Sequence, residues 1–200
     1  MSASLEEARA ALRQRQGGGA RYDAANAPAR ELDWARRGTA YFTRLLNGLP
    51  DAELDATSDW NPVSRRQLVV LAAYHARMLA ELVAWARENR TGPLPRPARV
   101  EKAELAWGMT LPDHALRNLV QHAIIHLDVE WRDLGDAGWD RNVTDSEGRS
   151  VTVRETPQWR ARLLWMVSMR LRAGGRRADV PAGLGEVLRE TDPTELLPVS

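Results

Sequence analysis

The sequence predicts an all-α protein: a four-helix bundle with one long crossover and a small β-hairpin before the last helix. Three observations lead to this prediction. Four segments repeat apolar residues at steps of three and four. A proline-rich stretch, residues 91–110, separates the second segment from the third. An alternating segment with a Ser-Glu-Gly turn precedes the fourth.

The first two long helices are expected over residues 28–47 and 64–89. Pro28 suits the first turn of the first helix, and Gly48 ends it. Ser64 is a favourable N-cap for the second helix. The inner face of the second helix is expected to hold apolar residues and one histidine at helical spacing: Leu68, Leu71, His75, Leu79, Leu82 and Ala86.

The third helix is expected over residues 112–134, with Thr110 or Asp113 as its N-cap. Its buried stripe is expected to comprise Leu116, Val120, Ala123, Leu127 and Trp131. After it, residues 142–144 and 150–154 alternate around the turn and are expected to pair as a small hairpin.

The fourth helix is expected over residues 156–171. Trp159, Leu163, Val167 and Leu171 lie one turn apart on a single face, which should point into the bundle. That face contains no histidine, acid or cysteine. The helix looks suited to a metal site, but this face offers no metal ligand.

The domain organisation follows from these elements. Residues 1–27 form an N-terminal segment, residues 28–175 the bundle, and residues 176–200 a tail without a separate second domain. A short helix near residues 184–190 is expected within that tail.

Composition excludes several classes of protein. The formal net charge is +1, from 28 Lys+Arg and 27 Asp+Glu, which argues against nucleic-acid binding. No apolar run approaches the roughly 18 residues needed to cross a bilayer, so no membrane partner is expected. The absence of cysteine excludes thiolate chemistry and suits a cytoplasmic protein. The oligomeric state is left open.

His75 is the first candidate catalytic residue, because it lies on the inner face of the second helix. One interpretation is a buried histidine that is hydrogen-bonded to a neighbour, and we favour it. The other is a general base or a donor that lines a pocket.

His122, His126 and Glu130 lie at i, i+4 and i+8 of the third helix. Two histidines one turn apart can bind Zn²⁺, but a single helix usually needs a third element to complete the site. We therefore favour polar side chains at the rim of the bundle and keep a metal site as the weaker alternative. His126 is also a candidate catalytic residue.

Arginines supply the remaining candidates. Arg132 either pins the end of the third helix through ion pairs or binds an acidic substrate, and we favour the first. Most of the arginines of the fourth helix are expected on a solvated face, with a carboxylate- or phosphate-binding rim as the minority interpretation. They are Arg160, Arg162, Arg170 and Arg172.

Three stretches of the chain resemble the mycothiol-dependent maleylpyruvate isomerase family, which has a DinB-like four-helix fold. They are residues 15–56, 64–87 and 126–140, and the string VEWRDLGDAGW within the last is the most specific. The resemblance implies a divalent metal, usually zinc, and mycothiol as a thiol cofactor. It also implies the isomerisation of maleylpyruvate to fumarylpyruvate.

The family's metal ligands are a histidine on the second helix and a Glu-x-x-x-His pair on the fourth. By this resemblance, those positions fall on Leu71, Leu163 and Val167, so all three ligands are missing. We therefore expect no metal and no cofactor. The former metal site is expected to be a pocket formed by Leu71, His75, Leu163 and Val167.

Two hypotheses about function follow. The first is a metal-free member of the family, natural or engineered, whose apolar bundle centre binds a small molecule. The second is an active isomerase or thiol transferase acting on a small unsaturated acid such as maleylpyruvate. It would use the remaining histidines or a metal at His122 and His126.

Overall fold

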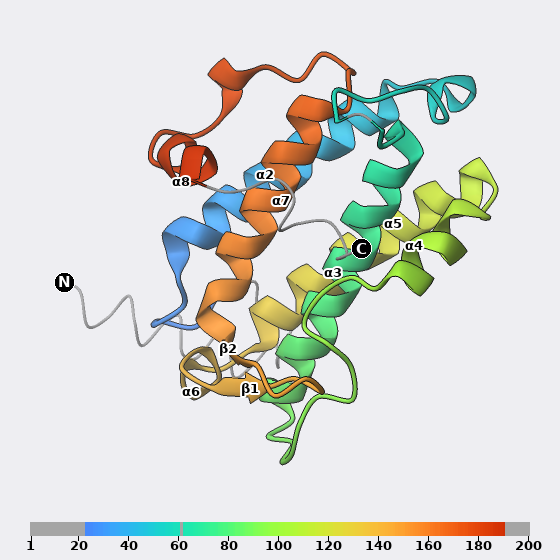
Figure 1. The fold of residues 1–200 in the computed structure, drawn as a ribbon. Helices are drawn as coiled ribbons and strands as arrows, with labels where there is room; N and C mark the ends of the chain where they lie inside the picture. Colours follow the sequence, from blue (N-terminus) through green and yellow to red (C-terminus); the bar gives the residue numbers. More distant parts are fainter. Residues whose placement is uncertain (1–22, 61, 191–200) are drawn as a thin grey trace, which may run out of the picture.

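The fold was analysed in a computed structural model, which describes residues 23–60 and 62–190. The predicted all-α bundle is confirmed. Its four long helices are α2 (Ala29–Asn47), α3 (Arg65–Arg87), α5 (Asp113–Asp133) and α7 (Thr156–Arg170). They pack chiefly as two pairs, α2 with α7 and α3 with α5, and α3 also packs on α7 (Figure 1). The amphipathic N-terminal segment lies mostly outside the described residues.

Within each pair the two helices run in the same direction. An ion pair between Arg66 and Asp113 joins the beginnings of α3 and α5. The Nε of Arg87 donates to Glu130 at 2.7 Å and joins their ends. The other pair runs the opposite way: Arg117, near the beginning of α5, donates to the backbone carbonyl of Leu46 in the last turn of α2 and to that of Leu49 just after it. This order requires the long crossover predicted between α3 and α5.

The α3 helix is the central element of the core. Ser64 caps it as predicted, in a capping box with Gln67. The whole predicted inner face is buried, including His75. The expectation that no apolar run is long enough to cross a membrane is wrong for α3 by length and composition. However, 78% of that apolar window is buried inside the bundle, as in the core helix of a globular protein.

The crossover contains a helix that was not predicted, α4 (Lys102–Met109). Glu101 and Glu104 form a capping box at its beginning, and Gly108 allows a close approach to Val70 of α3. The predicted caps of α5 are wrong, because Pro112 occupies the N-cap position and no side chain caps the helix. The predicted buried stripe of α5 is confirmed.

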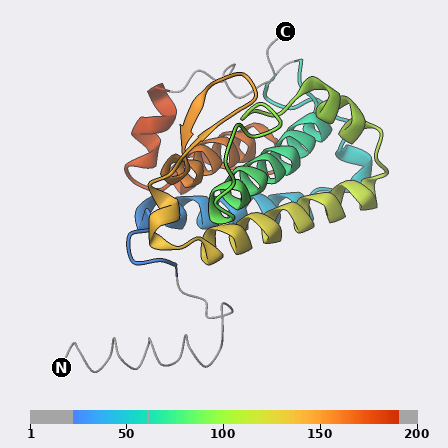
Figure 2. The ribbon, with the colours of Figure 1, turned by 90° about the horizontal axis from the view of Figure 1, so that it is seen from below.

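The predicted hairpin lies at the bottom of the view in Figure 1, and Figure 2 shows the molecule from that side. Its strands are β1 (Asn142–Thr144) and β2 (Ser150–Thr152), antiparallel with Val143 opposite Val151. The second strand is shorter than predicted, because Val153–Glu155 turn into a 3-10 helix, η3, that leads into α7. The short helix α6 (Asp136–Trp139) precedes the hairpin.

Part of the segment after α7 packs against the bundle. It contains the 3-10 helix η4 (Arg177–Asp179) and the predicted helix α8 (Leu184–Glu190), whose Leu184 is fully buried. The hydroxyl of Tyr41 on α2 donates to Asp179 at 2.6 Å. A further 3-10 helix, η2 (Asp51–Glu53), follows α2.

Candidate functional site

The predicted pocket residues lie where α3 meets α7 at the bundle centre. Leu71, Leu163 and Val167 belong to one hydrophobic cluster and are at most 1% exposed. On the predicted stripe of α7, Leu163, Val167 and Leu171 are buried, whereas Trp159 is half-buried. The helical spacing of these aliphatic residues therefore placed them correctly.

Arg160 is also buried at this interface, at 1% exposure. Its predicted place on a solvated face is wrong. The Nη1 of Arg160 donates to the backbone carbonyl of Ala72 on α3, at 2.6 Å, and Nη2 has no hydrogen-bond partner among the described residues. Burial lowers the pKa of Arg160 to about 9, so the guanidinium still carries its charge at neutral pH.

His75 is buried one helical turn from Leu71, and it faces the charge of Arg160. Loss of contact with water holds the pKa of His75 well below its usual value, and the positive charge of Arg160 lowers it further. The imidazole is therefore neutral at physiological pH. Its Nδ1 is buried and has no hydrogen-bond partner in the part of the chain that the structure describes, so the favoured interpretation of a hydrogen-bonded histidine is wrong for this atom.

The α5 residues considered for a metal site do not form a closed ligand set. His122 and His126 are exposed, whereas Glu130 is buried and binds Arg87. The Nε2 of His126 lies 3.4 Å from a Glu130 carboxylate oxygen. Among residues 23–60 and 62–190, no group of three or more His, Cys, Asp or Glu is arranged to hold a metal ion.

Arg132 is paired with its neighbour in the chain. Its Nε donates to Asp133 at 2.8 Å, at the end of α5. This contact agrees with the structural interpretation, and Arg132 lies in the last turn of α5, whereas His75 lies in the middle of α3. The structure therefore brings together only one of the three candidate catalytic residues, His75, with the predicted pocket.

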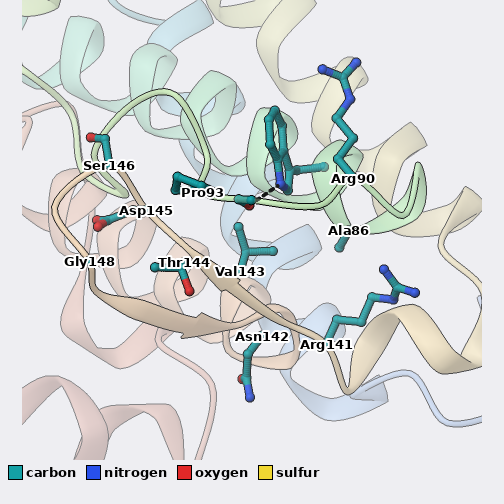
Figure 3. A pocket seen from close by; sticks show the side chains of 12 residues that line it. Ala86, Arg90, Pro93, Arg141, Asn142, Val143, Thr144, Asp145, Ser146 and Gly148 are labelled. Atoms are coloured by element: carbon teal, nitrogen blue, oxygen red, sulfur yellow. Dashed lines mark hydrogen bonds between the residues drawn. The ribbon is translucent and has the colours of Figure 1, made fainter.

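A separate surface hollow of about 580 Å³ lies between the end of α3 and the hairpin (Figure 3). Trp85, Arg90 and Arg141 are among the residues that line it. The guanidinium of Arg90 lies 5.0 Å from the centre of the Trp85 ring, whose Nε1 donates to the carbonyl of Gly92 at 3.3 Å. None of the predicted site residues lines this hollow.

The helix order, the crossover and the hairpin define a DinB-like four-helix protein with a candidate site between α3 and α7. Comparison with known proteins is more specific. The family model described as the mycothiol maleylpyruvate isomerase N-terminal domain matches residues 35–166. The chain belongs to this family.

Two solved structures show the same likeness. One is the crystal structure of the mycothiol-dependent maleylpyruvate isomerase, at 32% identity and a TM-score of 0.69. The other is a histidine-to-alanine mutant of the enzyme, at 32% identity and a TM-score of 0.70. Each match covers 80% of this chain and 65% of the solved chain, so this chain spans less than two thirds of those relatives. No curated protein matches the chain.

The residues at the implied metal positions do not fit a metal. A divalent cation needs lone pairs from nitrogen, oxygen or sulfur, and the side chains of Leu71, Leu163 and Val167 offer none. All three are packed as ordinary core. Two buried polar atoms without a partner among the described residues lie about one turn away on the same helices: Nδ1 of His75, after Leu71, and Nη2 of Arg160, before Leu163.

Proposed function

We propose that this chain is a metal-independent member of the family that binds a small molecule at the bundle centre. The observation that supports the proposal most directly is the character of Leu71, Leu163 and Val167. They are aliphatic, buried and share one cluster. Loss of a single ligand would leave the others as unpaired buried polar groups, which is destabilising. Replacement of all three by aliphatic residues closes the core instead.

Under this proposal, the chain belongs to the isomerase family but does not share the metal-dependent chemistry that the resemblance implies. The solved relatives are named as mycothiol-dependent isomerases. In this chain, no step of that reaction is assigned to the three aliphatic positions, because they cannot hold or polarise a reacting group. What remains at the centre is a neutral imidazole and a buried guanidinium. Such a pair can bind and orient a small molecule through hydrogen bonds and charge.

The first test is the metal content of the purified protein after incubation with zinc and dialysis, measured by mass spectrometry. We expect no stoichiometric zinc in the unaltered protein. A triple variant, Leu71→His with Leu163→Glu and Val167→His, should gain about one zinc per chain, because it restores three ligands on facing helices. Circular dichroism melts with and without zinc show whether the triple variant is folded and stabilised by the metal.

A matched variant, His122→Ala with His126→Ala, controls for the exposed pair on α5. Stoichiometric zinc in the unaltered protein that disappears in this double variant would overturn the proposal and favour a metal site on α5. The isomerase alternative is tested directly with mycothiol and maleylpyruvate. Formation of fumarylpyruvate by the unaltered protein would also contradict the proposal, whereas activity only in the triple variant would support it.

A further inference from the structure

Arg160 is unusual among the buried charged side chains because its charge is not neutralised. Arg66, Glu130 and Asp145 are also buried, and each forms an ion pair. No carboxylate of the described residues forms an ion pair with Arg160. Arg160 donates a hydrogen bond to the carbonyl of Ala72. A buried charge without a counter-charge is strongly destabilising, so its presence calls for an explanation.

The unpaired hydrogen-bonding groups at this point come from two different helices. Nη2 of Arg160 on α7 and Nδ1 of His75 on α3 are both buried, and neither has a partner among residues 23–60 and 62–190. Arg160 reaches the carbonyl of Ala72, three residues before His75, and its charge acts on the imidazole. The two groups therefore face each other across the α3–α7 interface.

The surroundings of this polar pair are apolar. Two hydrophobic clusters fill the bundle, and on α3 the boundary between them falls at His75. Ala72, Ala73 and Tyr74 belong to one cluster, and Ala76 begins the other. A ligand at the pair would therefore place its polar group between the two clusters and its remaining atoms against aliphatic side chains.

We propose that Arg160 and His75 bind the carboxylate of a small organic acid between α3 and α7. This inference rests on the proposed function and names the ligand class of that site. The guanidinium fork matches the geometry of a carboxylate and supplies one positive charge. The neutral imidazole donates from Nδ1 in the tautomer that carries its proton there.

Arg160 and His75 should favour an acid with a single negative charge. One guanidinium neutralises one negative charge, and the apolar clusters offer nothing to the second charge of a phosphate. A bound carboxylate would neutralise the charge of Arg160. It would also accept hydrogen bonds from Nη2 of Arg160 and Nδ1 of His75. Because both side chains are covered in this structure, neighbouring side chains must move to admit the acid. We therefore expect slow association.

The test is a titration of the purified full chain with sodium propionate, at constant ionic strength set by sodium chloride. Isothermal calorimetry and the melting temperature are the readouts. Propionamide, a neutral molecule of the same shape, and inorganic phosphate are the comparison ligands. We expect propionate to bind and to raise the melting temperature, with no effect of propionamide or phosphate at matched concentration.

Three variants assign the effect to the site. Arg160→Met removes the charge and keeps an unbranched side chain, and it should weaken propionate binding by about 10- to 100-fold. His75→Leu should weaken it by about 10-fold. Arg170→Met removes an exposed arginine of the same helix and should leave the affinity unchanged. In the absence of acid, Arg160→Met should melt at a higher temperature, because it removes an uncompensated buried charge.

The inference is overturned if propionate does not bind the unaltered protein, or if propionamide binds as well as propionate. It is also overturned if Arg160→Met and His75→Leu both bind with unchanged affinity. Because His75→Leu keeps the arginine, it provides an answer even if Arg160→Met does not fold. The zinc measurement and this titration have independent readouts. A negative titration with no zinc bound therefore rejects the acid site alone, and bound zinc rejects the proposed function alone.

Discussion

The neutral state of His75 should make the protein lose stability in mild acid. In the folded chain, burial and then the charge of Arg160 hold the pKa of His75 well below its usual value. In the unfolded chain the imidazole titrates near its ordinary pKa of about 6.5. Below that pH the unfolded state binds a proton that the folded state does not. The contribution is therefore fully present above about pH 6.5 and is lost as the pH falls.

The slope of this loss is about 1.4 kcal/mol per pH unit for one proton. Between pH 7.5 and pH 5.5 the free energy of unfolding should therefore fall by about 1.4 kcal/mol through His75 alone. Urea unfolding at pH 5.5, 6.5 and 7.5, in buffers without carboxylates, measures this fall in the free energy of unfolding. The difference in slope between the unaltered protein and His75→Leu isolates the contribution of His75. Equal slopes for the unaltered protein and His75→Leu would refute the reasoning.

Two further predictions concern the packing that positions the site. Gly38→Ala would place a methyl group 2.8 Å from Nε1 of Trp165, where α2 meets α7. We expect the free energy of unfolding, measured in urea, to fall by about 1 kcal/mol, because the cost of overpacking exceeds the gain in helix propensity. Gly135→Ala should leave this free energy unchanged, because a methyl group there meets nothing within 4 Å. Burial alone would raise the pKa of Asp145, but hydrogen bonds from three backbone amides and from the Arg149 side chain lower it to about 2. Asp145→Asn should therefore cost about 2 kcal/mol at pH 7. The stabilisation by Asp145 should disappear as the pH falls from 4 towards 2, and thermal melts at several pH values would show both effects.

Most of the fold could be predicted from helical periodicity. The buried stripes of α3 and α5 and the aliphatic positions of α7 were predicted residue by residue, because the spacing of three and four fixes which side chains share a face. The hairpin followed from alternation around Gly148, whose φ of +81° suits a turn. The α4 helix was missed because prolines at positions 93, 95 and 97 dominate the crossover. The capping pair Glu101 and Glu104 was its one local signal.

The candidate site was only half predictable. His75 was placed correctly on the inner face, but nothing in the sequence indicates that its Nδ1 has no partner, since hydrogen bonding depends on the opposite helix. Arg160 was assigned to solvent by residue type. Its spacing was the available signal, because it stands three residues before Leu163 and seven before Val167, the i, i+3, i+7 pattern of a buried face. The prediction that Arg160 is exposed gave more weight to its charge than to its position on the buried face.

The pairing of the helices gives the α3–α7 interface a mechanical role. Arg160 belongs to the α2–α7 pair and His75 to the α3–α5 pair. An acid held by both side chains would act as a non-covalent crosslink between the two halves of the bundle. Amide hydrogen exchange would then slow along the facing stretches of α3 and α7 together. A ligand in the hollow beside the hairpin would instead protect only β1 and the end of α3, so the pattern of protection would distinguish the two locations.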